Sequence, residues 1–371
     1  MRIAFIVHDY HKTGGHSRYV AELADRFARE HEVHIFANRI DGDRDPRIKF
    51  HYVPALRFSA LATILTFILP ATLRSYKEFD IVHAQGLCGL HQNVVTAHMC
   101  QAAWSIAQSR HMGLLTGKQK IFKLLVEPLE KRIFQTKATN AVIAVSRRVK
   151  GDLGTYYGRV DNVTVIHHGV DLMTFHPDNR YRWRVLMRQE LGLGNDKFVA
   201  LYVGDLTKGA IPAIEALAHV DTMRLVCVSA SDTTPYRLFA EKMGVLERVI
   251  FLPKTPTIER YYAAVDVFVL PSFYDTFGMV VSEAMATGLP VIVSGECGAS
   301  ELIEHEVSGV VIEQAWDAEI LAGWLERLRV DVMFRDKMGQ EARKKIEHFT
   351  WDDTAAETMR VYQKVLASSK K

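Results

Sequence analysis

Two carboxylates lie close together in the segment from Pro271 to Ile303, on either side of a predicted loop-to-helix junction. Asp275 belongs to the loop after an apolar strand, where it and the backbone N–H groups of Phe277 and Gly278 would face a ligand. Glu283 belongs to the following helix, among small apolar residues. A carboxylate buried there is costly unless hydroxyls or cations satisfy it, and the two hydroxyls of a ribose would do so. The alternative is a capped helix with one satisfied acid.

Two glycine-containing turns could bind a phosphate group. The first, Lys12-Thr13-Gly14-Gly15-His16, precedes a predicted helix, whose first N–H groups favour an anion. The second runs from Gly204 to Gly209, and its Lys208 would meet a diphosphate as a point charge. Neither turn is the G-x-G-x-x-G dinucleotide fingerprint, which argues against a nicotinamide oxidoreductase. The alternatives are a tight turn without a ligand and a solvated surface lysine.

The elements around these residues alternate between strand and helix, as in parallel α/β proteins. The pattern of the first half restarts after a predicted linker, which comprises Val170-Asp171 and the polar stretch 176–184. In such sheets a ligand lies beyond the carboxyl ends of the strands, so we expect the site in the cleft between two domains. The predicted strands are 2–8, 32–36, 79–83, 93–97, 141–145 and 163–166, then 198–203, 225–228, 249–252, 265–270 and 291–293.

The segment from Pro271 to Ile303 resembles the signature of family 4 retaining glycosyltransferases, which have the GT-B fold. Gly14-Gly15 resembles the family's N-terminal loop, and the C-terminal run FTWDDTAAETMRVYQKVL resembles its last helices, which cross back to the first domain. The resemblance covers nearly the whole chain. The signature positions that match are Pro271, Ser272, Asp275, Phe277, Gly278, Glu283, Ala284, Met285, Ala286, Gly288, Pro290, Val291, Ile292, Gly298 and Glu301.

The resemblance implies an α/β protein of GT-B fold, with two Rossmann-like domains facing across a cleft. The acceptor-side domain would span residues 1–172, and a C-terminal helix at about 354–371 would cross back to it. The domain that binds the nucleotide sugar would span residues 173–353.

The resemblance also implies an activity. A hexosyltransferase-type enzyme would move a sugar, with retention, from a UDP- or GDP-linked donor to a glycan or lipid-linked acceptor in cell-surface polysaccharide or glycolipid synthesis. His98 matches the family's active-site histidine and Asp275 would contact the sugar, whereas His83 is a weaker candidate. Catalysis would rest on positioning and charge stabilisation, without a metal or cofactor. The donor-binding residues would be Gly14, Gly15, Lys208, Phe277, Gly278, Met279 and Glu283.

Three positions depart from the family's pattern. Asp275 stands where glutamate is usual, and His168 stands where asparagine is usual. Asp205 follows the glycine of the second phosphate turn, where the family tends to carry arginine. Because a carboxylate would repel a diphosphate, we expect Asp205 to point away and Lys208 to neutralise more of the charge. These departures leave a non-catalytic sugar-nucleotide-binding protein open, and a sugar-nucleotide epimerase of the same fold is a further alternative.

The bulk properties exclude several other classes of protein. A net charge of +3 over 371 residues argues against a nucleic-acid partner. The four cysteines have neither zinc-site nor disulfide-framework spacing, and we interpret the D-x-D run Asp41-Gly42-Asp43 as a solvated turn. The N-terminal run is not a signal peptide, so we expect a cytoplasmic protein, with the inner face of the membrane as an alternative location.

Two segments suit peripheral contact with an anionic membrane. Residues 58–73 are apolar but too short to cross a bilayer and are interrupted by Pro70, which fits a buried helix or an interfacial one. Residues 110–150 are basic with interleaved apolar side chains, as expected for contact with anionic lipid or a lipid-linked glycan. The alternative for this stretch is the solvated face of an ordinary helix. Its basic residues include Lys118, Lys120, Lys123, Lys131, Arg132, Lys137, Arg147, Arg148 and Lys150.

Overall fold

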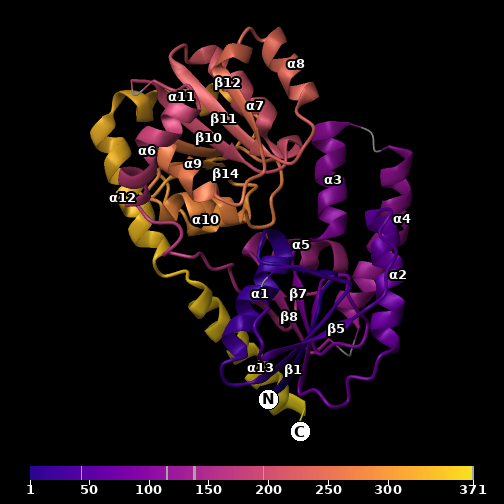
Figure 1. Cartoon of the computed structure of the whole chain (residues 1–371). Helices are drawn as coiled ribbons and strands as arrows, with labels where there is room; N and C mark the ends of the chain where they lie inside the picture. Colours follow the sequence, from indigo (N-terminus) through magenta and orange to yellow (C-terminus); the bar gives the residue numbers. More distant parts are fainter. Residues whose placement is uncertain (43, 114–115, 137–138, 195, 370–371) are drawn as a thin grey trace. The chain divides into compact units, whose positions relative to one another are not determined.

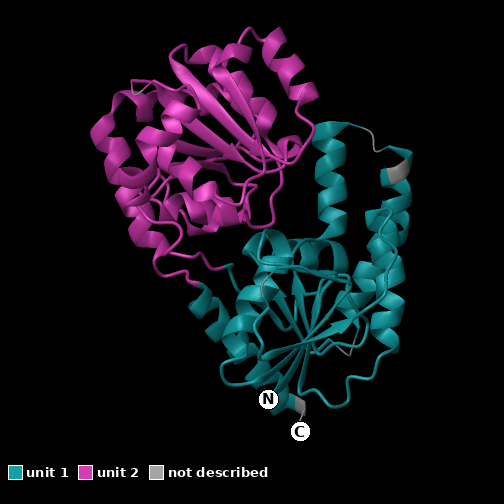
Figure 2. Cartoon of the chain, in the orientation of Figure 1, with its two compact units in different colours: residues 1–168, 351–371 teal, residues 169–350 magenta. Residues whose placement is uncertain are grey.

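A computed structural model of the chain describes residues 1–42, 44–113, 116–136, 139–194 and 196–369. Asp43 of the D-x-D run and Lys137 of the basic stretch lie outside the described residues. The chain forms two compact units, which Figure 2 shows in different colours. Unit 1 comprises residues 1–168 and 351–371, and unit 2 comprises residues 169–350.

Unit 1 is built on a seven-stranded parallel sheet with the strand order β5-β3-β1-β6-β7-β8-β9. Its central strands are buried and apolar, the pattern of a sheet covered by helices on both faces. A two-stranded sheet joins β2 (Asp9–Tyr10) to β4 (Arg39–Ile40). The main strands are β1 (Arg2–Ile6), β3 (Glu32–Ala37), β5 (Ile48–Tyr52), β6 (Ile81–Gln85), β7 (Val94–Ala97), β8 (Ala141–Ala144) and β9 (Val163–Val165).

The last helix of the chain, α13 (Trp351–Ser369), belongs to unit 1 and packs on α1 (Gly15–Phe27) (Figure 1), as predicted. The Tyr362 hydroxyl lies 2.7 Å from His83 Nδ1 in β6, and His83 Nε2 lies 2.6 Å from the Thr96 hydroxyl in β7. Burial lowers the pKa of His83 to about 3, so this histidine is a neutral link between α13 and the sheet. The other helices are α2 (Ala60–Leu73), α3 (Gln101–Met112), α4 (Gly117–Gln135) and α5 (Arg147–Tyr157).

Unit 2 contains a six-stranded parallel sheet with the order β12-β11-β10-β13-β14-β15. Its strands are β10 (Phe198–Val203), β11 (Met223–Ser229), β12 (Val249–Pro253), β13 (Val267–Leu270), β14 (Val291–Ser294) and β15 (Val310–Ile312). The α-helices are α6 (Asn179–Glu190), α7 (Ala210–Glu215), α8 (Thr234–Lys242), α9 (Ile258–Ala264), α10 (Met279–Ala286), α11 (Ala318–Val330) and α12 (Val332–Ile346). Among the described residues, the 3-10 helices are η1 (Leu206–Lys208), η2 (Ala216–His219), η3 (Leu246–Arg248) and η4 (Gly298–Leu302).

The two sheets confirm the predicted pair of Rossmann-like domains, with three local corrections. The edge strands β5 and β15 were not predicted. Pro70 does not end its helix, because α2 continues to Leu73. The predicted linker at 176–184 is wrong, because α6 begins inside it at Asn179.

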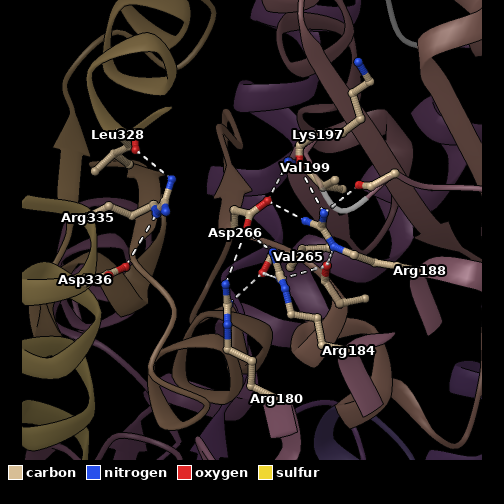
Figure 3. Close-up of polar contacts among 12 residues, drawn as sticks. Arg180, Arg184, Arg188, Lys197, Val199, Val265, Asp266, Leu328, Arg335 and Asp336 are labelled. Atoms are coloured by element: carbon tan, nitrogen blue, oxygen red, sulfur yellow. Dashed lines mark hydrogen bonds and ion pairs between the residues drawn. The ribbon is translucent and has the colours of Figure 1, made fainter. Parts of the chain in front are cut away.

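The helix α6 forms because its polar side chains have buried partners. Arg180, Arg184 and Arg188 recur every four residues and therefore lie along one face of the helix. Their guanidinium groups converge on Asp266, just before β13, at 3.3, 2.6 and 2.7 Å (Figure 3). Asp266 also accepts a hydrogen bond from the backbone of Val199 in β10. The arginines donate in addition to the backbone oxygens of residues 264 and 265, at the end of α9.

We predict that Asp266→Ala lowers the free energy of unfolding of the full chain by about 3–5 kcal/mol, because it leaves the buried Arg188 guanidinium group without its anion. Asp336→Ala is the matched control. Its carboxylate is 62% exposed and lies 3.7 Å from Arg335, so we expect a loss below about 1 kcal/mol. Urea denaturation measures both, and equal losses would show that the cluster around Asp266 does not stabilise unit 2.

Candidate functional site

The carboxyl ends of β10 and β13 bring Lys208 and Asp275 together in unit 2. These strands are neighbours at the point where the strand order of the sheet turns back on itself, the usual ligand position in such sheets. Lys208 Nζ lies 2.9 Å from Asp275 Oδ2, and both side chains are partly exposed. Although burial lowers the pKa of Lys208, the carboxylates of Asp275 and Asp205 together outweigh that effect and raise it. The site therefore holds a charged lysine beside a carboxylate.

A glycine allows the two loops to approach each other this closely. A Cβ added to Gly209 would lie 2.6 Å from the backbone oxygen of Pro271, a separation that side chains do not tolerate. The backbone N–H of Phe273 donates to the backbone oxygen of Lys208 at 3.0 Å. The turn that carries Lys208 is therefore fixed against the loop that carries Asp275.

The loop around Asp275 is anchored by its own backbone. The N–H of Asp275 donates to the Glu296 oxygen at 3.0 Å, and the Asp275 oxygen accepts from the N–H of Gly298 at 2.9 Å. The N–H of Phe277 donates to the Asp275 carboxylate at 3.3 Å. The sequence predicted that this N–H faces a ligand, whereas in the structure it faces the Asp275 side chain. The loop thus holds the carboxylate toward Lys208.

The helix α10 begins directly after this loop, with Gly278 as its N-cap. Gly278 has a φ of 83°, and an added Cβ would lie 2.8 Å from the Cys297 sulfur, so the position requires glycine. No side chain caps the helix. The Val281 N–H donates to the Gly278 oxygen at 2.9 Å, and the N–H groups of Met279 and Val280 precede this first bond of the helix. Such a helix start suits an anion such as phosphate.

Glu283 is buried on α10, as its apolar surroundings predicted. The Tyr262 hydroxyl of α9 lies 3.1 Å from both Glu283 Oε2 and the Val280 backbone oxygen. One hydroxyl proton is thereby shared between two acceptors. Tyr262 was not identified from the sequence, because nothing in the run IERYYAA distinguishes it from an ordinary core tyrosine.

The Asp205 side chain forms hydrogen bonds within the turn to which it belongs. Its carboxylate accepts hydrogen bonds from the backbone N–H and the hydroxyl of Thr207, at 3.0 and 2.8 Å. The Ser231 hydroxyl is a third donor at 3.2 Å. The carboxylate thus caps η1, which is a structural reason for an acid at this position.

In unit 1 the predicted phosphate turn leads into α1. Gly14 and Gly15 have φ values of 82° and 57°, in the left-handed region that favours glycine. Gly14 is the N-cap of α1 and no side chain caps the helix. The first turn of α1 also lacks acidic residues. The predicted phosphate turn therefore leads into a helix start that no side chain caps, and anion binding there stays a prediction.

His98 follows β7 at the same edge of the sheet. Its Nε2 lies 2.8 Å from Oε1 of Gln85, the last residue of β6. The rings of His16, Tyr19 and His168 have their centroids 5.6, 5.1 and 5.6 Å from that of His98. Burial is the main reason that the pKa of His98 lies well below its usual value, and the neighbouring His168 and His16 lower it further. His98 is accordingly a neutral imidazole at neutral pH.

In the part of the chain that the structure describes, no three histidine, cysteine, aspartate or glutamate side chains are grouped so that they could hold a metal ion. Asp41 of the D-x-D run pairs with Arg39 at 2.5 Å. All four cysteines are free and buried.

Known proteins match the chain over both units. Residues 184–345 match the family described as "Glycosyl transferases group 1", and residues 13–173 match "Glycosyltransferase Family 4". A D-inositol 3-phosphate glycosyltransferase of Xylanimonas cellulosilytica is 29% identical, over 94% of this chain and 91% of that protein.

Solved structures share the fold over nearly the whole chain. WaaG, a glycosyltransferase involved in lipopolysaccharide biosynthesis, has a TM-score of 0.76 at 21% identity, with 96% of this chain and 98% of WaaG covered. HepE of Anabaena, in complex with UDP and glucose, has a TM-score of 0.73 at 19% identity, with 98% and 99% covered. With these matches and two Rossmann-like sheets, the chain belongs to the group 1 glycosyltransferases of family 4 and has the GT-B fold.

Proposed function

We propose that this glycosyltransferase transfers a sugar, with retention of anomeric configuration, from a UDP- or GDP-linked donor to a glycan or lipid-linked acceptor in the synthesis of cell-surface polysaccharide or glycolipid. The Lys208–Asp275 pair beside the uncapped start of α10 carries the proposal. The complex of HepE with UDP and glucose supports a UDP-sugar, and the role of WaaG in lipopolysaccharide biosynthesis supports a cell-surface product.

Different residues would bind the different parts of the donor. Lys208 and the N–H groups that begin α10 neutralise the diphosphate, with Gly278 and Met279 contributing their backbone. Glu283 accepts hydrogen bonds from the ribose hydroxyls, and Asp275 accepts from the sugar. In unit 1, the backbone at Gly14 and Gly15 contributes to diphosphate binding, and His98 contacts the transferred sugar.

The transfer would need no protein nucleophile. The bond from the anomeric carbon to the phosphate oxygen breaks, and the acceptor oxygen bonds to the same face of that carbon. The departing phosphate takes the proton of the acceptor hydroxyl, so atoms and charge balance. The protein's contribution is positioning and stabilisation of the charge on the leaving diphosphate, and we propose that no metal is required.

We predict that one of UDP, GDP and ADP raises the melting temperature of the protein. Lys208→Ala and Glu283→Ala should each weaken that nucleotide's binding roughly ten- to hundredfold, because each removes charge-assisted hydrogen bonds of about 1.5–3 kcal/mol. Lys197→Ala, which removes a 43% exposed lysine of unit 2, is the control and should bind as wild type. If no nucleotide shifts the melting temperature, the donor assignment is wrong.

We predict that the product keeps the donor's anomeric configuration and that turnover continues in EDTA. Proton NMR of the new glycosidic linkage reports the configuration, and initial rates with and without chelator report the metal requirement. An inverted product would contradict the retaining mechanism, and loss of activity restored by a divalent cation would contradict metal independence. Nucleotide binding without turnover of any acceptor would favour the non-catalytic alternative, and a changed sugar nucleotide without an acceptor would favour an epimerase.

Two surface segments of unit 1, on α4 and α2, suit contact with an anionic membrane. On α4, Ile121, Leu124 and Leu125 are exposed on one face, with Lys120 and Lys131 exposed nearby. On α2, Leu69 and Leu73 are exposed, whereas Phe67 and Ile68 are buried. Within the described residues, no helix is long and apolar enough to cross a membrane. We propose that these faces lie at the surface of an anionic bilayer, where a lipid-linked acceptor would be presented.

We predict co-sedimentation with vesicles that contain anionic lipid at low salt, and weaker binding at high salt because the charges are screened. Ile121→Ser combined with Leu124→Ser should weaken binding, since these side chains are 54% and 73% exposed in the basic helix. Met333→Ser, at an 85% exposed position of unit 2, should bind as wild type. Absence of binding at both salt concentrations would overturn the membrane proposal.

A further inference from the structure

Gln85 makes a hydrogen bond that determines where His98 carries its proton. The Gln85 side chain ends β6, is only 3% exposed, and directs Oε1 at His98 Nε2 over 2.8 Å. An amide oxygen only accepts hydrogen bonds, so this contact requires a proton on Nε2 of the imidazole.

The surroundings of the ring keep it neutral, so it carries one proton. The titratable groups that face it are His16 and Tyr19 from α1, His83 from β6 and His168 after β9. Burial raises the pKa of Tyr19 to about 12, so this phenol is uncharged at neutral pH. With no carboxylate among these groups, nothing favours the imidazolium, and Nδ1 keeps its lone pair.

Gln85 and His98 each have one buried polar atom without a hydrogen-bond partner among the described residues. These atoms are His98 Nδ1 and Gln85 Nε2. An unmatched buried donor or acceptor is costly, so the site favours a ligand that supplies both functions. A hydroxyl group donates and accepts, and a sugar presents several of them.

We propose that Gln85 is a positioning residue that holds His98 in the tautomer protonated on Nε2, so that Nδ1 accepts a hydrogen bond from a hydroxyl of the transferred sugar. This inference rests on the proposed function, in which His98 contacts that sugar. The fold makes the pairing available, because β6 and β7 are adjacent and Gln85 is in register with Thr96, just before His98.

The tautomer and pKa of His98 can be measured by nitrogen-15 NMR of the full chain without any donor. We expect the Nε2–H tautomer in the wild type and a mixture of tautomers in Gln85→Leu. Gln85→Glu, which has nearly the same shape, should raise the pKa of His98 by about one unit or more, because a carboxylate replaces the amide. Gln92→Glu is the control: Gln92 is 2% exposed and bonds to Thr139 instead, so its variant should leave His98 unchanged. An Nδ1–H tautomer in the wild type, or an unchanged pKa in Gln85→Glu, would overturn the proposal.

Kinetics distinguish positioning from a structural role. Gln85→Leu should lower kcat roughly tenfold or more, while the KM for the nucleotide sugar changes by less than about twofold. In a His98→Ala background the same change should have no further effect, because Gln85 acts through His98. An equal loss in both backgrounds would overturn the proposal. If the wild type turns over no nucleotide sugar, the proposed function fails, and the NMR result separately decides whether Gln85 fixes the tautomer.

Discussion

Parallel strands cannot be joined by tight turns, and this constraint organises both units. Every strand must be followed by a crossover, so the carboxyl ends of all strands lie along one edge of each sheet. The strand order turns back beside the first strand of each unit, between β1 and β6 and between β10 and β13. Residues distant in sequence therefore meet at this edge. Lys208 reaches Asp275, and Gln85 reaches His98, because their strands are neighbours.

Unit 2 has an ion-pair site at Asp266 and another at Asp275, and the two differ in how deeply they are buried. Asp266 precedes β13 and lies at the amino-terminal side of that strand, where its carboxylate accepts from three arginines and a backbone N–H. The arginines donate in addition to neighbouring carbonyl oxygens. Such a multiply bonded network is rigid, because removing Asp266 leaves the buried Arg188 charge without its partner. Asp275 follows β13, and its pair with Lys208 remains partly exposed. The second pair can exchange partners with a ligand at lower cost, since water screens the separated charges.

Local patterns predicted the elements and the carboxylates better than they predicted the contacts. Alternation of apolar strands with amphipathic helices gave both sheets, and the run around Glu283 indicated a buried acid because its neighbours are small and apolar. The helix α6 was mistaken for a linker, because its arginines are satisfied by Asp266, which is remote in sequence. Tyr262 and Gln85 were missed for the same reason. A polar residue whose partners are distant in sequence carries no local signal.

The two aspartates that depart from the family's pattern have separate roles in the structure. Asp205 is engaged by Thr207 and Ser231, so its charge is used within its own turn. Asp275 instead pairs with the partly buried Lys208 and serves as its counter-ion. Under the proposed function, a donor replaces this pair: its diphosphate takes Lys208, and the freed carboxylate is available to the sugar hydroxyls. Binding would then cost one half-buried ion pair and form two charge-assisted contacts, one at each end of the donor. Because the lysine and the carboxylate exchange partners together, recognition of the diphosphate and of the sugar would be coupled through Lys208 and Asp275.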